Sequence, residues 1–186
     1  MRIFPNGWSD EAAIRPSEHF NERPEGEEIS LLVIHNISLP AGQFGTGDAL
    51  FCGTLDCCKH PSYQDLEGLR VSSHFFIDRI GRLFQYVSCL DRAWHAGVSS
   101  FEGRENCNDF SIGVELEGTD STPYERVQYE TLARLTDALA EAYPIKYVTG
   151  HSMIAPLRKT DPGPAFDWLM YESLCKTGKP LCFPYV

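Results

Sequence analysis

Short apolar runs, separated by stretches rich in glycine and proline, dominate the pattern of hydrophobic and polar positions. Residues 31–34 read Leu-Leu-Val-Ile, which suits a buried β-strand, and His35 follows at the end of this run. Residues 70–77 and 83–87 are rich in β-favouring side chains and flank a glycine-containing turn, so they predict a β-hairpin. A last short strand is predicted at 146–149.

Residues 111–117 alternate in a way that is typical of a further strand. One face carries the apolar side chains of Ile112, Val114 and Leu116. The other face carries Gly113, Glu115 and Glu117. This second face is expected either to meet solvent or to form the floor of a site.

The main helix is predicted to begin near residues 121–125. Thr122 and Glu125 have the spacing of a capping box, and Pro123 suits a first helical position. Pro144 is expected to end this helix. A second helix is predicted at 166–176. The apolar face of the first helix comprises Val127, Leu132, Leu135, Leu139 and Ala142.

Two stretches lack a regular pattern. Residues 1–29 are polar and contain several prolines, so they are expected to wrap the surface before the first strand. Residues 36–63 hold too many helix breakers for a long helix, although 48–53 fit a single helical turn. A long irregular segment beside a site is often functional, so this loop is expected to form one wall of a substrate cleft.

The elements together predict a single α/β domain over residues 1–186, with one mixed β-sheet of about five or six strands flanked by helices. The 186 residues, with 42% apolar and 23% charged side chains, suit one globular domain. A net charge of −10 argues against nucleic acid as a partner. No apolar run approaches the roughly 20 residues of a membrane span, and the N-terminus lacks the apolar core of a signal peptide.

These features favour a soluble, cytoplasmic protein without a membrane partner, and a monomer is expected. Seven cysteines, an odd number, favour reduced thiols over a disulfide framework. Cys52, Cys57, Cys58 and His60 raise the alternative of a second zinc site. Their spacing matches no established zinc ribbon and a second ligand pair is absent, so the sequence argues against that alternative.

The segment 149–166 concentrates candidate chemistry. His151 and Asp161 offer a nitrogen and an oxygen, and Pro162-Gly163-Pro164 stiffens the backbone just after them. Catalytic zinc takes three protein ligands and keeps one position open, so a third ligand is needed. His35 is the candidate, although a single histidine after a strand is more often a packed residue than a ligand.

Four separated motifs give the sequence a resemblance. They read LLVIHNISLP, VSSHFFIDRIGRLFQYV, RAWHAGVSSFEGRENCNDFSIGVELEG and TGHSMIAPLRKTDPGPAFDW. Together these motifs are similar to those of the AmpD-type cytosolic amidases. Members of this family are zinc N-acetylmuramoyl-L-alanine amidases that cleave 1,6-anhydromuramyl peptides during cell-wall recycling. Their fold resembles that of phage lysozyme-type amidases and peptidoglycan recognition proteins.

The resemblance implies specific roles. It implies a zinc ion held by His35, His151 and Asp161. Glu115 would handle the proton, and Lys159 would stabilise a developing oxyanion. Contacts with a small soluble muropeptide would come from Asn36, Arg70, His74, Trp94 and His95.

This chain departs from the relatives at two positions. Ser73 stands where phage-type relatives carry a tyrosine, which favours Glu115 over a phenol as the proton carrier. Asn106 stands where the family often has a second arginine for substrate carboxylates. Two other functions stay open at this point: a muropeptide-binding module without hydrolysis, and an autolysin that acts on polymeric cell wall.

Overall fold

A computed structural model describes residues 1–184. Its centre is a six-stranded mixed sheet in which only one neighbouring pair, β4 with β5, is antiparallel. Across the sheet the strands are β1 (Ala13–Ile14), β5 (Leu83–Gln85), β4 (Phe75–Ile77), β9 (Ser111–Glu117), β3 (Leu31–Ile37) and β10 (Tyr147–Gly150). Two short ladders lie outside it, β2 (Phe20–Glu22) with β6 (Asp91–Ala93) and β7 (Ser100–Phe101) with β8 (Arg104–Glu105).

The predicted strands are confirmed with adjusted bounds. The hairpin strands are shorter than predicted and cover Phe75–Ile77 and Leu83–Gln85. Just before β4, the hydroxyl groups of Ser72 and Ser73 bond to backbone carbonyls. β3 runs three residues further than the apolar run, since its parallel pairing with β9 continues to Ile37 and Glu117. His35 therefore lies within the strand and not after it.

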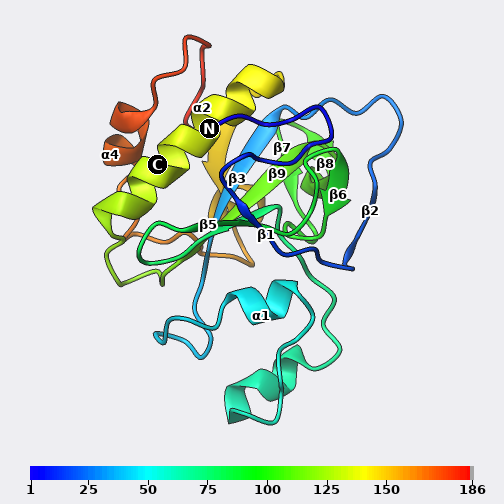
Figure 1. The fold of residues 1–186 in the computed structure, drawn as a ribbon, viewed down its shortest axis with the longest axis vertical. Helices are drawn as coiled ribbons and strands as arrows, with labels where there is room; N and C mark the ends of the chain where they lie inside the picture. Colours follow the sequence, from blue (N-terminus) through cyan, green and yellow to red (C-terminus); the bar gives the residue numbers. More distant parts are fainter. Residues whose placement is uncertain (185–186) are drawn as a thin grey trace.

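Two helices cover one face of the sheet. Figure 1 shows α2 (Arg126–Ala142) and α4 (Trp168–Leu174) side by side, and the main core lies between them and the sheet. Leu132, Leu135 and Leu139 are buried in this core as predicted. Val127 is 39% exposed and Ala142 is also exposed, so these two positions of the predicted apolar face are wrong.

The start of α2 differs from the prediction. Thr122 does not cap the helix, because its hydroxyl and amide both bond to the Thr119 hydroxyl in a local turn. The capping box belongs to Glu125 and Gln128, whose side chain accepts from the Glu125 amide at 3.0 Å. Pro123 consequently lies before the helix. The predicted end is confirmed, since the helix ends at Ala142, two residues before Pro144.

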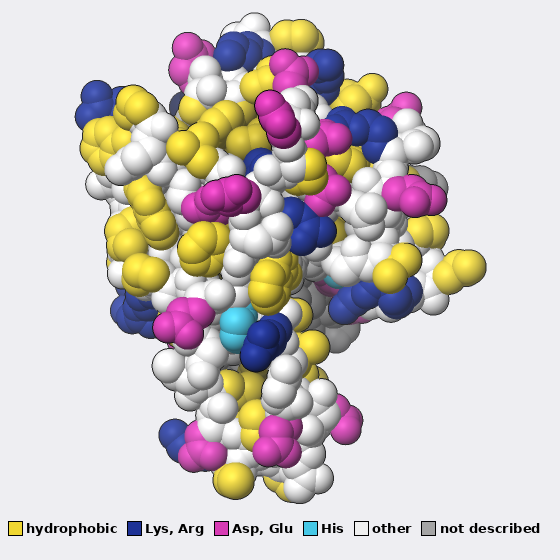
Figure 2. All heavy atoms as spheres, turned by 90° about the vertical axis from the view of Figure 1, so that its right-hand side faces the viewer, with side chains coloured by type: hydrophobic (Ala, Val, Ile, Leu, Met, Phe, Trp, Pro, Cys, Tyr) yellow, Lys and Arg dark blue, Asp and Glu magenta, His cyan; other side chains and the backbone are white. Residues whose placement is uncertain are grey.

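The remaining helical segments are short. They are α1 (Asp48–Phe51), α3 (His151–Ile154) and the 3-10 turns η1 (Pro61–Leu66) and η2 (Cys107–Asp109). α1 confirms the helical turn predicted within residues 48–53. The segment that carries α1 and η1 lies below the sheet in Figure 1 and forms a smaller lobe under the main body in Figure 2. Among the described residues no helix combines the length and apolar character that crossing a bilayer requires.

The N-terminal segment does more than wrap the surface. It adds β1 to the sheet and places the partly buried side chain of Arg23 against the segments around Cys89 and Asn108. The Arg23 guanidinium donates to the backbone carbonyls of Cys89, Asn108, Asp109 and Ser111 at 2.8–3.3 Å. Its burial lowers the pKa of Arg23 to about 10. This one side chain therefore ties the first residues of the chain to the segment that enters β9.

His74 is a fully buried titratable group of the interior. Its Nδ1 accepts from the Gly113 amide at 3.0 Å, and its Nε2 lies 3.1 Å from both the Asp91 carbonyl and the Arg23 guanidinium. Burial, and then the charge of Arg23, lowers the pKa of His74 to about 3. The imidazole is therefore neutral in the folded protein at any pH near neutrality.

We expect the free energy of unfolding to fall as the pH drops below 6.5, because the unfolded chain then binds a proton at His74 and the folded chain does not until about pH 3. Each pH unit within this window costs about 1.4 kcal/mol, or roughly 3 kcal/mol down to pH 4.5. Urea unfolding at pH 6.5 and at pH 4.5 measures this change in the free energy of unfolding. A His74→Asn variant should be less stable at pH 6.5 but should lose less on acidification; equal losses in both proteins would contradict the assignment.

Candidate active site

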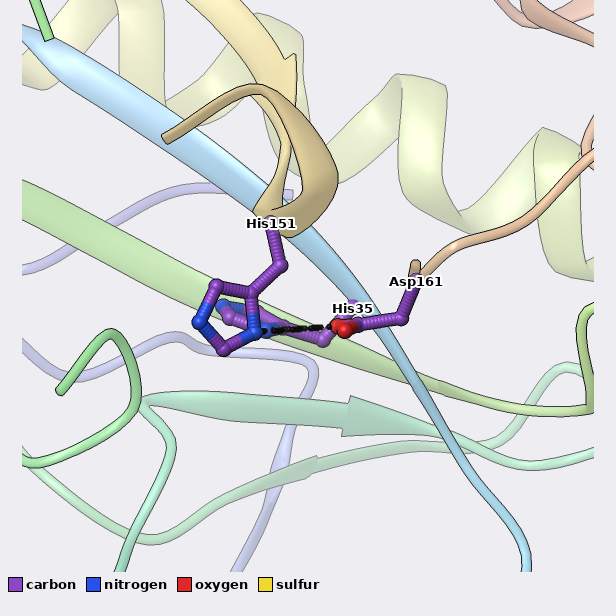
Figure 3. A group of neighbouring side chains, drawn as sticks. All are labelled: His35, His151 and Asp161. Atoms are coloured by element: carbon purple, nitrogen blue, oxygen red, sulfur yellow. Dashed lines mark hydrogen bonds and ion pairs between the residues drawn. The ribbon is translucent and has the colours of Figure 1, made fainter. Parts of the chain in front are cut away.

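Three candidate ligands converge at the carboxyl ends of the central parallel strands. His35 lies on β3, His151 is the first residue of α3 and Asp161 lies on the loop that follows (Figure 3). The two Nδ1 atoms are 3.0 Å apart, and Asp161 Oδ2 lies 3.1 Å from His35 Nδ1 and 3.2 Å from His151 Nδ1. The structure thus brings together the three residues that the sequence proposed from two distant segments.

The side chains of His35, His151 and Asp161 bring more hydrogen-bond acceptors together than donors. Burial lowers the pKa of His35 to about 4, so its imidazole is neutral. Burial opposes ionisation of Asp161, but the contacts of its carboxylate with the His151 and His35 imidazoles outweigh it and hold its pKa well below the usual range. A carboxylate and two imidazole nitrogens in contact need a positive charge between them. Nitrogen and oxygen donors in this number suit zinc with one open position.

Within residues 1–184, no other set of three or more His, Cys, Asp and Glu side chains comes as close together. No such group is formed by the residues considered as a possible second zinc site, which are Cys52, Cys57, Cys58 and His60. The candidate metal site among the described residues therefore consists of His35, His151 and Asp161.

The loop that carries Asp161 is held from two sides. The Pro162 carbonyl accepts from the Tyr124 hydroxyl at 2.8 Å and from Asn36 Nδ2 at 3.1 Å. Gly163 has φ +80° and packs directly on Asp120, where a β-carbon would come within 2.3 Å of the Asp120 backbone. The prolines and glycine therefore fix the carboxylate as expected, with the help of Asn36, which the resemblance assigned to the substrate, and of the Tyr124 hydroxyl, which the sequence did not single out.

Glu115 lies on β9 directly beside His35, its partner in the parallel ladder. Its Oε1 is 4.0 Å from His35 Nδ1, and its Oε2 is buried without a hydrogen-bond partner. Burial, and then the charge of Asp161, raises the pKa of Glu115 well above its ordinary value. An unpartnered carboxyl group with a raised pKa beside a metal site is suited to carry a proton.

Glu117, two residues further along the same face, has a different environment. It is 3% exposed, and its carboxylate accepts from the backbone amides of Gly45 and Arg79. It therefore anchors the loop after β3 and the hairpin turn to the sheet. The sequence left open whether this face of the strand meets solvent or forms the floor of a site. Because the Glu115 and Glu117 side chains are both buried, the face does not meet solvent and forms the floor of a site.

A cleft of about 620 Å³ opens over these residues. One wall comes from the long loop, which contributes Ile37, Ser38, Ala41, Leu50 and Phe51. The floor and the other wall include the three converging ligands, Glu115, Asn36, Trp94, His95, Asp120, Arg158 and Lys159. The cleft is large enough for a sugar and several amino-acid residues, which is within the range of small-molecule sites.

Known proteins are similar to this chain in sequence and in fold. The family model for N-acetylmuramoyl-L-alanine amidase matches residues 25–164. The 1,6-anhydro-N-acetylmuramyl-L-alanine amidase AmpD of Citrobacter freundii is 54% identical over 176 residues, which cover 92% of this chain and 94% of that protein. A crystal structure of a selenomethionine derivative of AmpD has a TM-score of 0.89 at 53% identity and covers 94% of this chain and 99% of that chain.

The chain belongs to the N-acetylmuramoyl-L-alanine amidase family. The predictions of an AmpD-type amidase and of an enzyme are thereby confirmed. A complex of the Escherichia coli amidase AmiD with anhydro-N-acetylmuramic acid-L-Ala-D-γ-Glu-L-Lys has a TM-score of 0.60 at 27% identity, covering 85% of this chain and 66% of that chain. Human PGRP-Iβ, at 14% identity and a TM-score of 0.56, shares the fold alone, and the predicted fold class is confirmed.

Two cations of this amidase line the cleft, Arg158 and Lys159. Lys159 lines the cleft, and its charge acts to lower the pKa of both Glu115 and His35 against the larger effect of burial on Glu115. Arg158 was not singled out from the sequence. Its Nη2 donates to the carbonyls of Ala96 and Val98 at 2.8 Å each, so the guanidinium is held at the rim of the cleft.

The five predicted substrate contacts separate into three groups. Asn36, Trp94 and His95 line the cleft. Arg70 is exposed and lines a smaller neighbouring cavity of about 210 Å³. His74 is completely buried beneath β9 and does not line the cleft, so its predicted contact with substrate does not fit this structure.

The N-terminal segment supports the rim at Trp94. The indole Nε1 donates to Asn21 at 2.6 Å, and the ring stacks on His19 with a 6.1 Å separation of the ring centres. No signal in the sequence linked these residues to the cleft, because they lie more than 70 positions from Trp94. Asn106, which replaces the second arginine of the family, is exposed and outside the cleft.

Proposed function

We propose that this amidase is zinc-dependent and hydrolyses the amide bond between the lactyl group of 1,6-anhydro-N-acetylmuramic acid and L-alanine in a soluble muropeptide. The observation that carries the proposal is the convergence of His35, His151 and Asp161 beside the unpartnered carboxyl group of Glu115. The anhydro sugar is supported by the name of the Citrobacter freundii relative and by the ligand in the AmiD complex.

His35, His151 and Asp161 would hold the zinc ion. When bound, zinc supplies Lewis-acid polarisation of a carbonyl and lowers the pKa of water to about 7. Glu115 would take the proton from the attacking water and return it to the leaving amine of L-alanine. The raised pKa of Glu115 lets its carboxyl group hold a proton more readily than an exposed glutamate does, which suits it to this transfer.

Lys159 would stabilise the negative charge that develops on the scissile carbonyl oxygen. A fixed cation in a partly closed cleft acts most strongly on charge that appears only in the transition state. Arg158, which is anchored by two backbone carbonyls at the rim, would meet a carboxylate of the stem peptide. Asn36, Trp94 and His95 would contact the substrate within the cleft, and Arg70 would do so only at its periphery.

A role in cell-wall recycling is part of this proposal, since the proposed substrate is a soluble fragment of the wall and not the polymer itself. This substrate favours the recycling enzyme over an autolysin. The predicted cytoplasmic location and monomeric state remain predictions.

Cleavage of 1,6-anhydromuramyl tripeptide by the purified protein tests the proposal directly. Mass spectrometry should detect the free anhydro sugar and the tripeptide, and the bound zinc should amount to one ion per chain. Removing the metal with a chelator should abolish cleavage, and added zinc should restore it. A folded protein that binds zinc but leaves this substrate intact would overturn the proposed substrate.

The proton-carrying role of Glu115 predicts a separation of turnover from metal binding. Glu115→Ala should keep the zinc content and the fold, because the residue is not a ligand, but should lose activity by about 10²- to 10⁴-fold. In the wild type, activity should fall on the acid side as Glu115 becomes protonated, and the variant should lack this limb in its residual activity. Unchanged turnover in the variant would exclude this role.

The role of Lys159 predicts that Lys159→Ala lowers kcat by about 10²- to 10³-fold while zinc stays bound. Lys146→Ala is the matched control, since Lys146 is an exposed lysine outside the cleft and should leave turnover unchanged. Metal analysis accompanies both variants. Loss of zinc from Lys159→Ala would show that the lysine supports the site and does not act on the reaction.

A further inference from the structure

A chain of hydrogen bonds leads away from His35 on the side opposite to the other ligands. His35 Nε2 lies 2.9 Å from His95 Nδ1, and His95 Nε2 lies 3.1 Å from the Ser111 hydroxyl. The hydroxyl in turn lies 2.5 Å from the backbone carbonyl of Cys107. Neither His95 nor Ser111 belongs to the ligand set, and Ser111 is completely buried.

The direction of these hydrogen bonds follows from their last member. A carbonyl oxygen only accepts, so the single proton of the Ser111 hydroxyl points to Cys107. The hydroxyl must then accept from His95, which places a proton on His95 Nε2. An imidazole with its single proton on Nε2 has a lone pair on Nδ1, so His95 Nδ1 accepts from His35 Nε2.

We propose that Ser111 and His95 act as positioning residues that hold the proton of His35 on Nε2 and so leave its Nδ1 free as a metal ligand. The inference rests on the zinc site of the proposed function. It explains why the His35 ring presents Nδ1 to His151 and Asp161, since the opposite tautomer would place two N–H groups or two lone pairs against each other along the chain of hydrogen bonds.

The segment His95–Ala96 also orients the second histidine ligand, His151. His151 Nε2 donates to the Ala96 carbonyl at 3.1 Å, which leaves His151 Nδ1 to face the metal site. Asn108 Oδ1 accepts from the backbone amides of both His95 and Ala96, at 3.1 and 2.8 Å. One buried side chain therefore fixes the backbone from which both ligand histidines are oriented.

β9 is shaped to accommodate the His95 ring. A β-carbon at Gly113 would lie 2.5 Å from the ring, so the absence of a side chain at this position lets the imidazole lie against the strand. Ser111 and Glu115 lie on the same face of this strand, on either side of Gly113. β9 thus carries the end of the hydrogen-bond chain, the space for the relaying ring and the proton carrier in alternate positions.

The tautomer can be tested without any variant and without substrate. In the zinc-free wild-type protein labelled with nitrogen-15, long-range proton–nitrogen spectra assign the protonated nitrogen of each histidine. His35 should carry its proton on Nε2, and His95 should also carry its proton on Nε2. Observation of the Nδ1-protonated form of His35 would overturn the proposal.

Zinc affinity supplies the second test. Ser111→Ala removes the acceptor for His95, so the tautomer preference of His35 should weaken and zinc affinity, measured by chelator competition, should fall by about 10- to 100-fold. Ser111→Thr keeps the hydroxyl and should restore most of the affinity. Ser73→Ala is the matched control, because Ser73 is equally buried and its hydroxyl donates to a carbonyl of the same strand, that of Gly113.

An equal loss of affinity in Ser111→Ala and Ser73→Ala would contradict the proposal, since it would reflect a general loss of stability. Unchanged affinity in Ser111→Ala would contradict it as well. If Ser111→Ala does not fold, the spectra of the wild type still decide the tautomer. Failure of this inference is distinct from failure of the proposed function, because a wild type that binds zinc and cleaves muropeptide could still show the wrong tautomer.

Discussion

The parallel pairing of β3 with β9 is the constraint on which the site depends. It places His35 and Glu115 next to each other on the face of the sheet opposite α2 and α4. A shift of one residue would turn every side chain of one strand to the other face and would separate the ligand from the proton carrier. Leu32, Ile34, Ile112, Val114 and Leu116 resist such a shift, because it would move their side chains out of the main core.

The same face has to bury polar groups, and hydrogen bonds reduce the cost of doing so. The His74 ring bonds to backbone groups of Gly113 and Asp91. The His95 ring bonds to the Ser111 hydroxyl, and its backbone amide donates to Asn108. Arg23 satisfies carbonyls at the entrance to β9, including those of Asn108 and Ser111. Glu115 Oε2 is an exception, and an unsatisfied buried carboxyl oxygen costs about 1–3 kcal/mol. Such a cost is expected where a group has to remain available to a substrate.

The sequence was most informative where a local rule operates without competition. The alternation at residues 111–117 corresponds to β9 with the same bounds. The start of α2 was misplaced because two local signals competed: Thr122 joined a turn with Thr119, and Glu125 took over the cap. His74 was assigned to the substrate because its motif resembles the family, but burial depends on what packs over a strand, which no local pattern reports.

The sequence by itself determined five strands of the central sheet, the candidate ligands and the family, because periodicity, turn chemistry and motif order are all local properties of the chain. Only the tertiary structure decided which polar side chains act on which others. His35 and His151 are 116 positions apart, and Arg23 reaches Ser111 across 88 positions. The roles of Ser111, Asn108 and Arg158 depend on distances and directions between such remote segments. Those are set by strand register and core packing, so no single stretch of the chain encodes them.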